Sequence, residues 1–136
     1  MTIKNVVSEN EPQAFEKCID IEHGETDCEV RGGPLLEELF HNLVENSILH
    51  SNCDRIRISS KENEEECIVT IEDDGKEISE EDKDKIFGRG YKKGETGGSG
   101  LGLFLVKEIA ESYGGNIQVK NSKLGGVRFD VRLKKS

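Results

Sequence analysis

The chain has 136 residues, a formal net charge of −9, 33% hydrophobic residues and 5% aromatic residues. This length fits about one domain with a single core. The acidic balance argues against a nucleic-acid-binding surface, which needs clustered Lys and Arg to contact phosphates. The apolar runs are short, so we expect neither a signal peptide nor a membrane-spanning helix, and the sequence favours a cytoplasmic setting.

Metal and redox chemistry by cysteine or histidine is not expected. Cys18, Cys28, Cys53 and Cys67 contain no CxxC pair. We therefore expect small buried thiols in a reducing compartment. The spacing of the histidines does not place two of them on one helix turn, so a histidine-bound metal is not predicted either.

The first half of the chain predicts a linker, a strand and a long helix. Residues 1–12 are polar and contain Pro12, which indicates a lead-in or linker before a domain over residues 13–136. Alternating apolar and charged residues predict a strand over residues 15–21. Apolar residues at three- and four-residue intervals predict an amphipathic helix over residues 35–49.

A hairpin and a short helix should follow. Alternating patterns predict strands over residues 54–61 and 67–71, joined by an acidic tip. A capping-box pattern at Ser79 predicts a short helix to Ile86. Residues 88–100 hold six glycines and no apolar periodicity, which is typical of a long functional loop.

The end of the chain predicts a second core helix over residues 101–113 and two strands, over residues 117–119 and 127–133. Strand pairs dominate the whole order of elements, and the helices are few. We therefore expect an α/β (α+β) two-layer sandwich, with a mixed, mostly antiparallel sheet covered on one face by helices.

The glycine run from Gly97 to Leu103 predicts a phosphate cradle. Four glycines fall within six residues directly before a helix, where backbone N–H groups and a partial positive charge favour an anion. A Walker loop would place Lys and Ser or Thr after the last glycine, but Leu103 and Phe104 follow here. A dinucleotide fingerprint would need a strand leading into the glycines. A glycine-rich linker without a ligand stays open.

Three other features point toward a nucleotide. Asn42 and Asn46 lie on one helix face and could offer oxygens to a hard cation such as Mg²⁺, unless they are ordinary surface asparagines. Asp73, at a strand end before Gly75, could accept a hydrogen bond from an exocyclic amine, although turn aspartates are common there. The loop cations could offset triphosphate charge or only be solvated; they are Arg89, Lys92 and Lys93.

Residues 15 to about 134 contain these motifs in this order and resemble the catalytic ATP-binding domain of sensor histidine kinases. This family lies in the superfamily of DNA gyrase and the heat-shock chaperone ATPases. The resemblance rests on Asn42-Leu-Val-Glu-Asn46-Ser47, Asp73-Asp74-Gly75, Ile86-Phe87, Gly98-Ser-Gly100-Leu-Gly102-Leu103 and Gly125-Gly126-Val127-Arg128-Phe129.

The resemblance implies a Bergerat-type ATP-binding fold with ATP and Mg²⁺ as cofactors. It implies that Asn46 coordinates Mg²⁺, that Asn42 supports the phosphates or the metal, and that Asp73 accepts a hydrogen bond from the adenine amine. It also implies an ATP lid over residues 87–99. The remaining residues implied to hold the nucleotide are Gly75, Ile78, Arg89, Lys92, Lys93, Gly98, Gly100, Leu101 and Gly102.

The asparagine at position 42 bears on the reaction. ATPases of the superfamily place a glutamate there to activate water, and an amide is a poor general base. The resemblance therefore implies phosphotransfer rather than rapid hydrolysis. Three departures from the family pattern, Glu77, Leu49 and Val127, suggest weak ATP binding.

The resemblance also implies partners. The γ-phosphate would pass to a histidine on a separate helical dimerisation domain, and then to a response regulator. We expect no nucleic-acid partner and no direct membrane contact of this domain. Two alternatives stay open: an anti-sigma-type serine kinase or switch protein, and a degenerate nucleotide-sensing interaction module.

Overall fold

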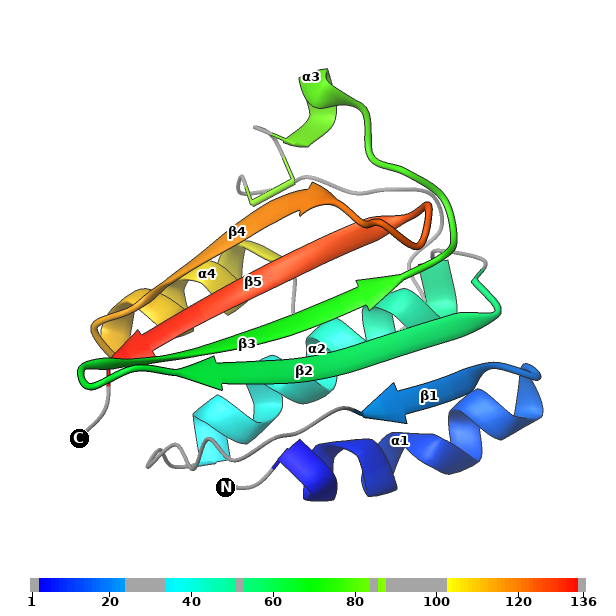
Figure 1. Cartoon of the computed structure of the whole chain (residues 1–136), viewed down its shortest axis with the longest axis horizontal. Coiled ribbons are helices and arrows are strands. Elements are labelled where there is room, and N and C mark those ends of the chain that lie inside the picture. Colours follow the sequence, from blue (N-terminus) through cyan, green and yellow to red (C-terminus); the bar gives the residue numbers. More distant parts are fainter. Residues whose placement is uncertain (1–2, 24–33, 51–52, 84–85, 88–102, 135–136) are drawn as a thin grey trace.

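A five-stranded sheet carries three longer helices on one of its faces (Figure 1). The structure is a computed structural model that describes residues 3–23, 34–50, 53–83, 86–87 and 103–134. The elements are α1 (Ile3–Glu16), β1 (Asp20–His23), α2 (Pro34–His50), β2 (Arg55–Glu62), β3 (Glu66–Asp73), α3 (Glu80–Lys83), α4 (Leu103–Ser112), β4 (Asn116–Asn121) and β5 (Val127–Lys134).

The sheet has the strand order β1-β2-β3-β5-β4. β1 pairs with β2 in parallel, and the other neighbours pair antiparallel. The parallel pair arises because α2 crosses from the end of β1 back to the start of β2, which is the usual way to join parallel strands. The predicted sandwich, with a mixed and mostly antiparallel sheet, is confirmed.

The N-terminal segment differs from the sequence expectation. Residues 3–12 form most of α1 instead of a polar lead-in, and the predicted strand over 15–21 is confined to Asp20–His23. Val7, Asn10 and Ala14 are buried at helical spacing, and Asn10 is the polar residue that obscured this pattern. Pro12 lies inside the helix and is exposed to solvent. That residues 13–136 form a single domain stays a prediction.

The core lies between the sheet and the helices. The apolar stripe of α2 predicted from its spacing is fully buried, as are the alternate residues of the central strands. The buried residues of these elements include Leu36, Leu39, Phe40, Leu43, Val44, Ile48, Ile56, Ile58, Val69, Ile71, Phe129, Val131 and Leu133. The predicted helices and strands after residue 33 are confirmed, with α3 ending at Lys83 rather than Ile86.

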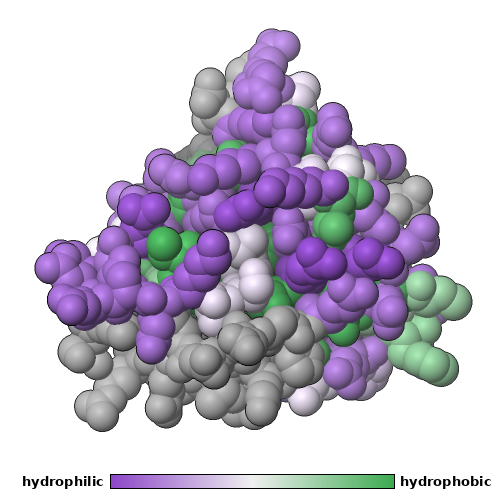
Figure 2. Space-filling model, viewed as in Figure 1, coloured by the Kyte–Doolittle hydropathy of each residue, from purple (hydrophilic) through white to green (hydrophobic). Residues whose placement is uncertain are grey.

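The opposite face of the sheet faces solvent and is hydrophilic (Figure 2). Oppositely charged side chains pair across strands on this face, and Glu22 pairs with Arg55 and Arg57. Asp130 is mostly buried there. Burial by itself would raise its pKa, but hydrogen bonds from Arg128, Lys120 and Thr70 outweigh burial and hold the pKa of Asp130 below its usual value.

Among the described residues, no helix is both long and apolar enough to cross a membrane. Cys18 is an exposed thiol and Cys53 a buried one, whose Sγ donates to the carbonyl of Ser47. Cys67 is disulfide-bonded, so the expectation of a thiol is wrong for that residue.

Candidate functional site

Asp73 occupies the end of β3 with its side chain turned toward the helical layer. Its position alternates with that of Ile71, so it shares the inner face of the sheet, and it is 2% exposed. Its Oδ1 accepts the backbone N–H of Gly75 at 3.0 Å and that of Val127 at 3.3 Å. Two backbone donors on one oxygen fix the orientation of the carboxylate.

The turn between β4 and β5 is attached to this strand end. Gly126 donates its N–H to the carbonyl of Asp73 at 3.1 Å, and the Ser122 hydroxyl donates to Glu72 at 2.9 Å. The Ser122 Oγ also accepts the N–H of Leu124 at 3.0 Å, which closes the turn on itself. A segment about 50 residues downstream therefore forms one wall around Asp73.

The neighbouring aspartate, Asp74, contacts a different part of the sheet. Asp74 turns toward β2, where its Oδ1 accepts the N–H groups of Asp54 at 2.9 Å and Arg55 at 3.0 Å. It thereby caps the first residues of the neighbouring strand. Of the two adjacent carboxylates, Asp73 alone is directed into the interior.

Asn42 and Asn46 lie one turn apart on α2, as predicted. Asn42 is 6% exposed, and its amide nitrogen donates to the carbonyl of Glu38 at 2.6 Å and to Glu38 Oε1 at 3.3 Å. These contacts turn the amide oxygen of Asn42 away from Glu38. Asn46 is half-buried. Both asparagines lie on α2, which packs against β3, the strand that carries Asp73. The C-terminal ends of α2 and β3 lie at the same end of the molecule (Figure 1).

Further predicted residues lie around the end of β3. Gly75 is placed by its hydrogen bond to Asp73, and Ile78 is buried in the core three residues later. Ile86 is buried, and the Phe87 ring packs edge-on against Phe129 with ring centroids 6.3 Å apart. The remaining predicted contacts lie outside the described residues: Arg89, Lys92, Lys93, Gly98, Gly100, Leu101 and Gly102.

Sequence reasoning assigned no role in the site to three residues that shape it, although Gly126 belongs to one of the quoted motifs. Gly126 has no room for a side chain, because a Cβ there would lie 2.3 Å from Asp73 Oδ1 and 2.6 Å from Gly75 N. Ser122 holds the turn, and Glu38 orients Asn42. The spacing of four residues between Glu38 and Asn42 could have indicated their contact. The contacts of the turn depend on strand register, which carries no local signal.

Comparison with known families gives a match over most of the chain. Residues 33–136 match the family model described as histidine kinase-, DNA gyrase B-, and HSP90-like ATPase. The sensor protein SrrB of Staphylococcus aureus, strain NCTC 8325 / PS 47, is 36% identical over 107 residues, which are 74% of this chain and 18% of SrrB. The chain therefore spans about a fifth of the length of the curated relatives it matches.

Solved structures agree with the fold. The catalytic domain of histidine kinase ThkA in a nucleotide-free form is 29% identical, with a TM-score of 0.83 over 98% of this chain and 90% of that chain. The ATP-binding domain of PrrB from Mycobacterium tuberculosis is 24% identical, with a TM-score of 0.80 over 100% of this chain and 96% of that chain. The PrrB likeness bears on the fold alone.

Proposed function

Since the chain belongs to the histidine kinase-, DNA gyrase B- and HSP90-like ATPases, as a catalytic ATP-binding domain of the sensor histidine kinase type, we propose that it binds MgATP for phosphotransfer. The γ-phosphate passes to a histidine on a separate helical dimerisation domain. The observation that carries this proposal is the buried Asp73 carboxylate, fixed by two backbone donors at the end of β3.

Asp73 recognises the adenine base in this proposal. Its carboxylate accepts a hydrogen bond from the exocyclic amine, and its fixed orientation means that little conformational freedom is lost on binding. Gly126 lets the β4–β5 turn lie directly against this carboxylate, because any side chain there would collide with it. Gly75 and Ile78 line the same region. A guanine base presents a carbonyl oxygen at this position, which a carboxylate repels, so the site favours adenine.

Asn46 and Asn42 support the metal and the phosphates. Amide oxygens are hard ligands of the kind that Mg²⁺ accepts, usually completed by phosphate oxygens and water. Glu38 accepts hydrogen bonds from the amide nitrogen of Asn42, so the amide oxygen points away from the preceding turn of α2. This orientation suits an oxygen ligand of Mg²⁺. When bound, Mg²⁺ neutralises phosphate charge. The lid completes the site with the backbone of Gly98, Gly100, Leu101 and Gly102 and the side chains of Arg89, Lys92 and Lys93.

The domain holds ATP for transfer rather than for rapid hydrolysis. Asn42 has no basic atom near neutral pH, so it does not activate a water molecule. Catalysis then consists of holding the γ-phosphate in line with an imidazole nitrogen. His41 is held between Asn10 and Glu45, with its Nδ1 3.1 Å from Asn10 Nδ2 and its Nε2 3.4 Å from Glu45 Oε2. It is therefore poorly placed as the acceptor.

The partners follow from this chemistry. The acceptor histidine lies on a helical dimerisation domain, in the full-length protein or in another chain, and a response regulator takes the phosphate afterwards. We place the domain in the cytoplasm, where ATP is available, without direct contact to a membrane or to nucleic acid. Val127, which is buried beside Asp73, and Glu77, which is exposed, both depart from the family pattern. Because of these departures we expect a modest ATP affinity.

Calorimetric titration of the chain with ATP, with and without Mg²⁺, tests the proposal. We expect saturable binding in the micromolar to millimolar range that strengthens with Mg²⁺. Asn46→Ala should abolish the gain in ATP affinity that Mg²⁺ provides, and it should leave the ATP affinity measured without Mg²⁺ unchanged. If no saturable binding is seen up to millimolar ATP, the kinase proposal is wrong and a nucleotide-independent interaction module is favoured.

A further inference from the structure

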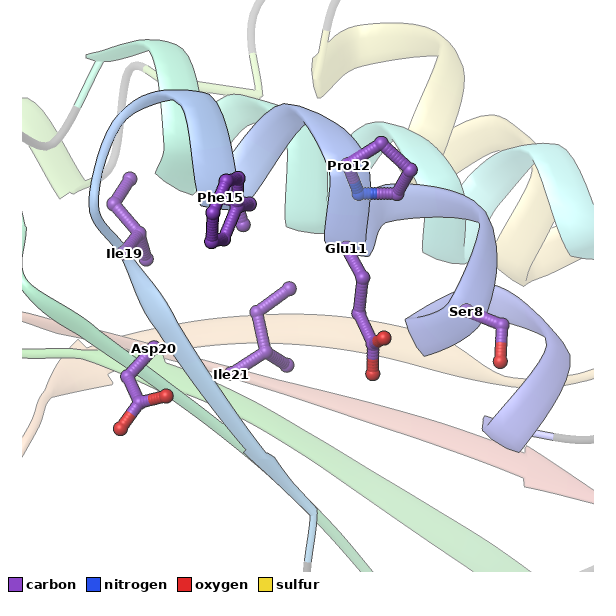
Figure 3. Close-up of a pocket in the computed structure, with 8 residues that line it drawn as sticks. Ser8, Glu11, Pro12, Phe15, Ile19, Asp20 and Ile21 are labelled. Atoms are coloured by element: carbon purple, nitrogen blue, oxygen red, sulfur yellow. The ribbon is translucent and has the colours of Figure 1, made fainter.

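A hollow of about 590 Å³ lies between α1 and β1, on the edge of the sheet opposite β4 (Figure 3). Its walls are largely apolar and come from Pro12, Ala14 and Phe15 of α1 and from Ile19 and Ile21 around the start of β1. This α1–β1 groove belongs to no part of the nucleotide site. Its volume lies within the range of about 300–1,000 Å³ that is typical of ligand-binding pockets.

Phe15 stands at the rim of the groove and is 83% exposed. Among the described residues it is the more exposed of two large hydrophobic side chains on the surface, the other being Leu105 at 43%. An aromatic ring left in water beside an apolar hollow is a typical anchor for a protein partner.

The backbone around Phe15 is held rigidly. The Ile19 N–H donates to the Ala14 carbonyl at 2.8 Å, and the Cys18 N–H donates to the Phe15 carbonyl at 3.1 Å. Cys18 has a φ of 58°, which completes the Schellman motif at the end of α1. Ile19 and Ala14 are both buried at this closure. The exposed ring is therefore presented on a preorganised frame, which lowers the entropy cost of binding.

The groove is acidic. Glu11 lines it on the same side of β1 as Ile21, and exposed Glu16 follows directly after Phe15. Asp20 also borders the hollow, but its carboxylate lies on the other side of β1 (Figure 3). The chain as a whole carries a formal net charge of −9. Carboxylates around an apolar surface attract a partner that carries Lys or Arg beside its own apolar residues, and they raise its rate of association.

We propose that the α1–β1 groove binds a basic amphipathic helix of a partner protein. Apolar side chains from one face of that helix pack against Phe15 and Ile21, and flanking Lys or Arg side chains pair with Glu11 and Glu16. An extended partner strand fits less well, because the described part of this edge, β1, is 4 residues long. A second copy of this chain would bring like-charged carboxylates together.

Fluorescence anisotropy with a synthetic probe tests the proposal. The probe is a labelled peptide of about four helical turns, built from Leu on one face and Lys on the other. We expect saturable binding that weakens with added salt. Phe15→Ala should weaken binding at least about tenfold, as for the loss of an interface anchor. Leu105→Ala is the matched control and should leave the affinity unchanged.

Charge reversal separates a specific site from general attraction to an acidic protein. The double variant Glu11→Lys, Glu16→Lys should lose the Leu/Lys peptide and gain affinity for the matched Leu/Glu peptide. A double variant of the acidic β2–β3 hairpin, Glu64→Lys and Glu65→Lys, makes the same change in net charge at exposed residues away from the groove. It should retain the Leu/Lys peptide.

Three results would overturn the proposal. They are no saturable binding of the Leu/Lys peptide, equal affinity of wild type and Phe15→Ala, and equal losses in the two charge-reversal variants. Self-association of the chain that Phe15→Ala abolishes would instead assign the groove to a second copy. Thermal unfolding of each variant and an unchanged ATP affinity confirm that the fold and the nucleotide site persist.

Discussion

Gly126 lies directly against Asp73: a Cβ on Gly126 would be 2.3 Å from the Asp73 Oδ1 and 2.6 Å from the Asp73 carbonyl oxygen. The contact joins the turn before β5 to the end of β3, two segments far apart in the sequence. The turn can lie this close to the buried carboxylate only because residue 126 has no side chain.

Gly126→Ala should lower both stability and ATP affinity. The atoms that the new methyl group would meet include backbone atoms, which move less easily than a side-chain end. Overpacking of this kind costs about 1–3 kcal/mol, and we expect the upper end of that range. Urea denaturation measures the loss. Lys123→Ala, at an exposed position of the same turn, should change stability by less than about 0.5 kcal/mol. Equal stability of the two variants would contradict the contact.

Asp73→Asn should weaken ATP binding about 10- to 100-fold, as expected for one lost hydrogen bond at a buried site. Asn retains an oxygen that can accept the N–H groups of Gly75 and Val127, so the fold should persist. Its amide nitrogen, however, would face the adenine amine with a donor instead of an acceptor. Calorimetric titration gives the affinity. An unchanged affinity would remove Asp73 from base recognition.

Asp74→Ala should have the opposite profile to Asp73→Asn. It removes the acceptor of the Asp54 and Arg55 N–H groups, so we expect a loss of about 1 kcal/mol in stability. Because Asp74 is directed away from the site, ATP affinity measured below the unfolding transition should stay within about twofold of wild type. A large affinity loss at full folding would show that the two adjacent carboxylates share the nucleotide.

Asp130 should make stability depend on pH in the acid range. Its folded pKa lies below the unfolded value, so its contribution is fully present above the unfolded pKa of about 4 and is lost as pH falls through the folded pKa. Asp130→Asn should therefore be less stable than wild type by about 1–2 kcal/mol at neutral pH. The difference should shrink below about pH 4. Chemical denaturation of both proteins from pH 3 to about pH 7 measures it, and a difference that grows toward acid would refute this assignment.

Pro12→Ala tests the N-terminal helix. Pro12 lies in the interior of α1, where it lacks the N–H that would bond back to Ser8, and it is exposed. Ala restores the donor without disturbing the core, so we expect stability to rise by about 1 kcal/mol or more. Thermal unfolding followed by circular dichroism measures the change. If this segment were a linker, the substitution would leave stability unchanged.

The same helix shows why sequence patterns failed in one place. The buried face of α1 passes through Asn10, whose amide nitrogen lies 3.1 Å from His41 Nδ1 on α2. A polar residue in a buried stripe and a proline inside a helix both argue locally against a packed helix. They are tolerated here because α2 supplies the hydrogen-bond partner and because Pro12 faces solvent. Likewise, the sequence pattern placed Phe15 at the start of a strand, but Phe15 lies in the last turn of α1 and is exposed.

Within the described residues from 34 onward, the sequence by itself determined the type and order of the helices and strands, and it carried the motifs of the family. Those features depend on local periodicity and on residue chemistry. Only the tertiary structure decided that Asp73 turns inward while Asp74 caps β2, that Gly126 forms the wall beside Asp73, and that Phe15 borders an acidic groove. These outcomes depend on strand register and on packing between distant segments, and neighbouring residues in the sequence carry no record of either.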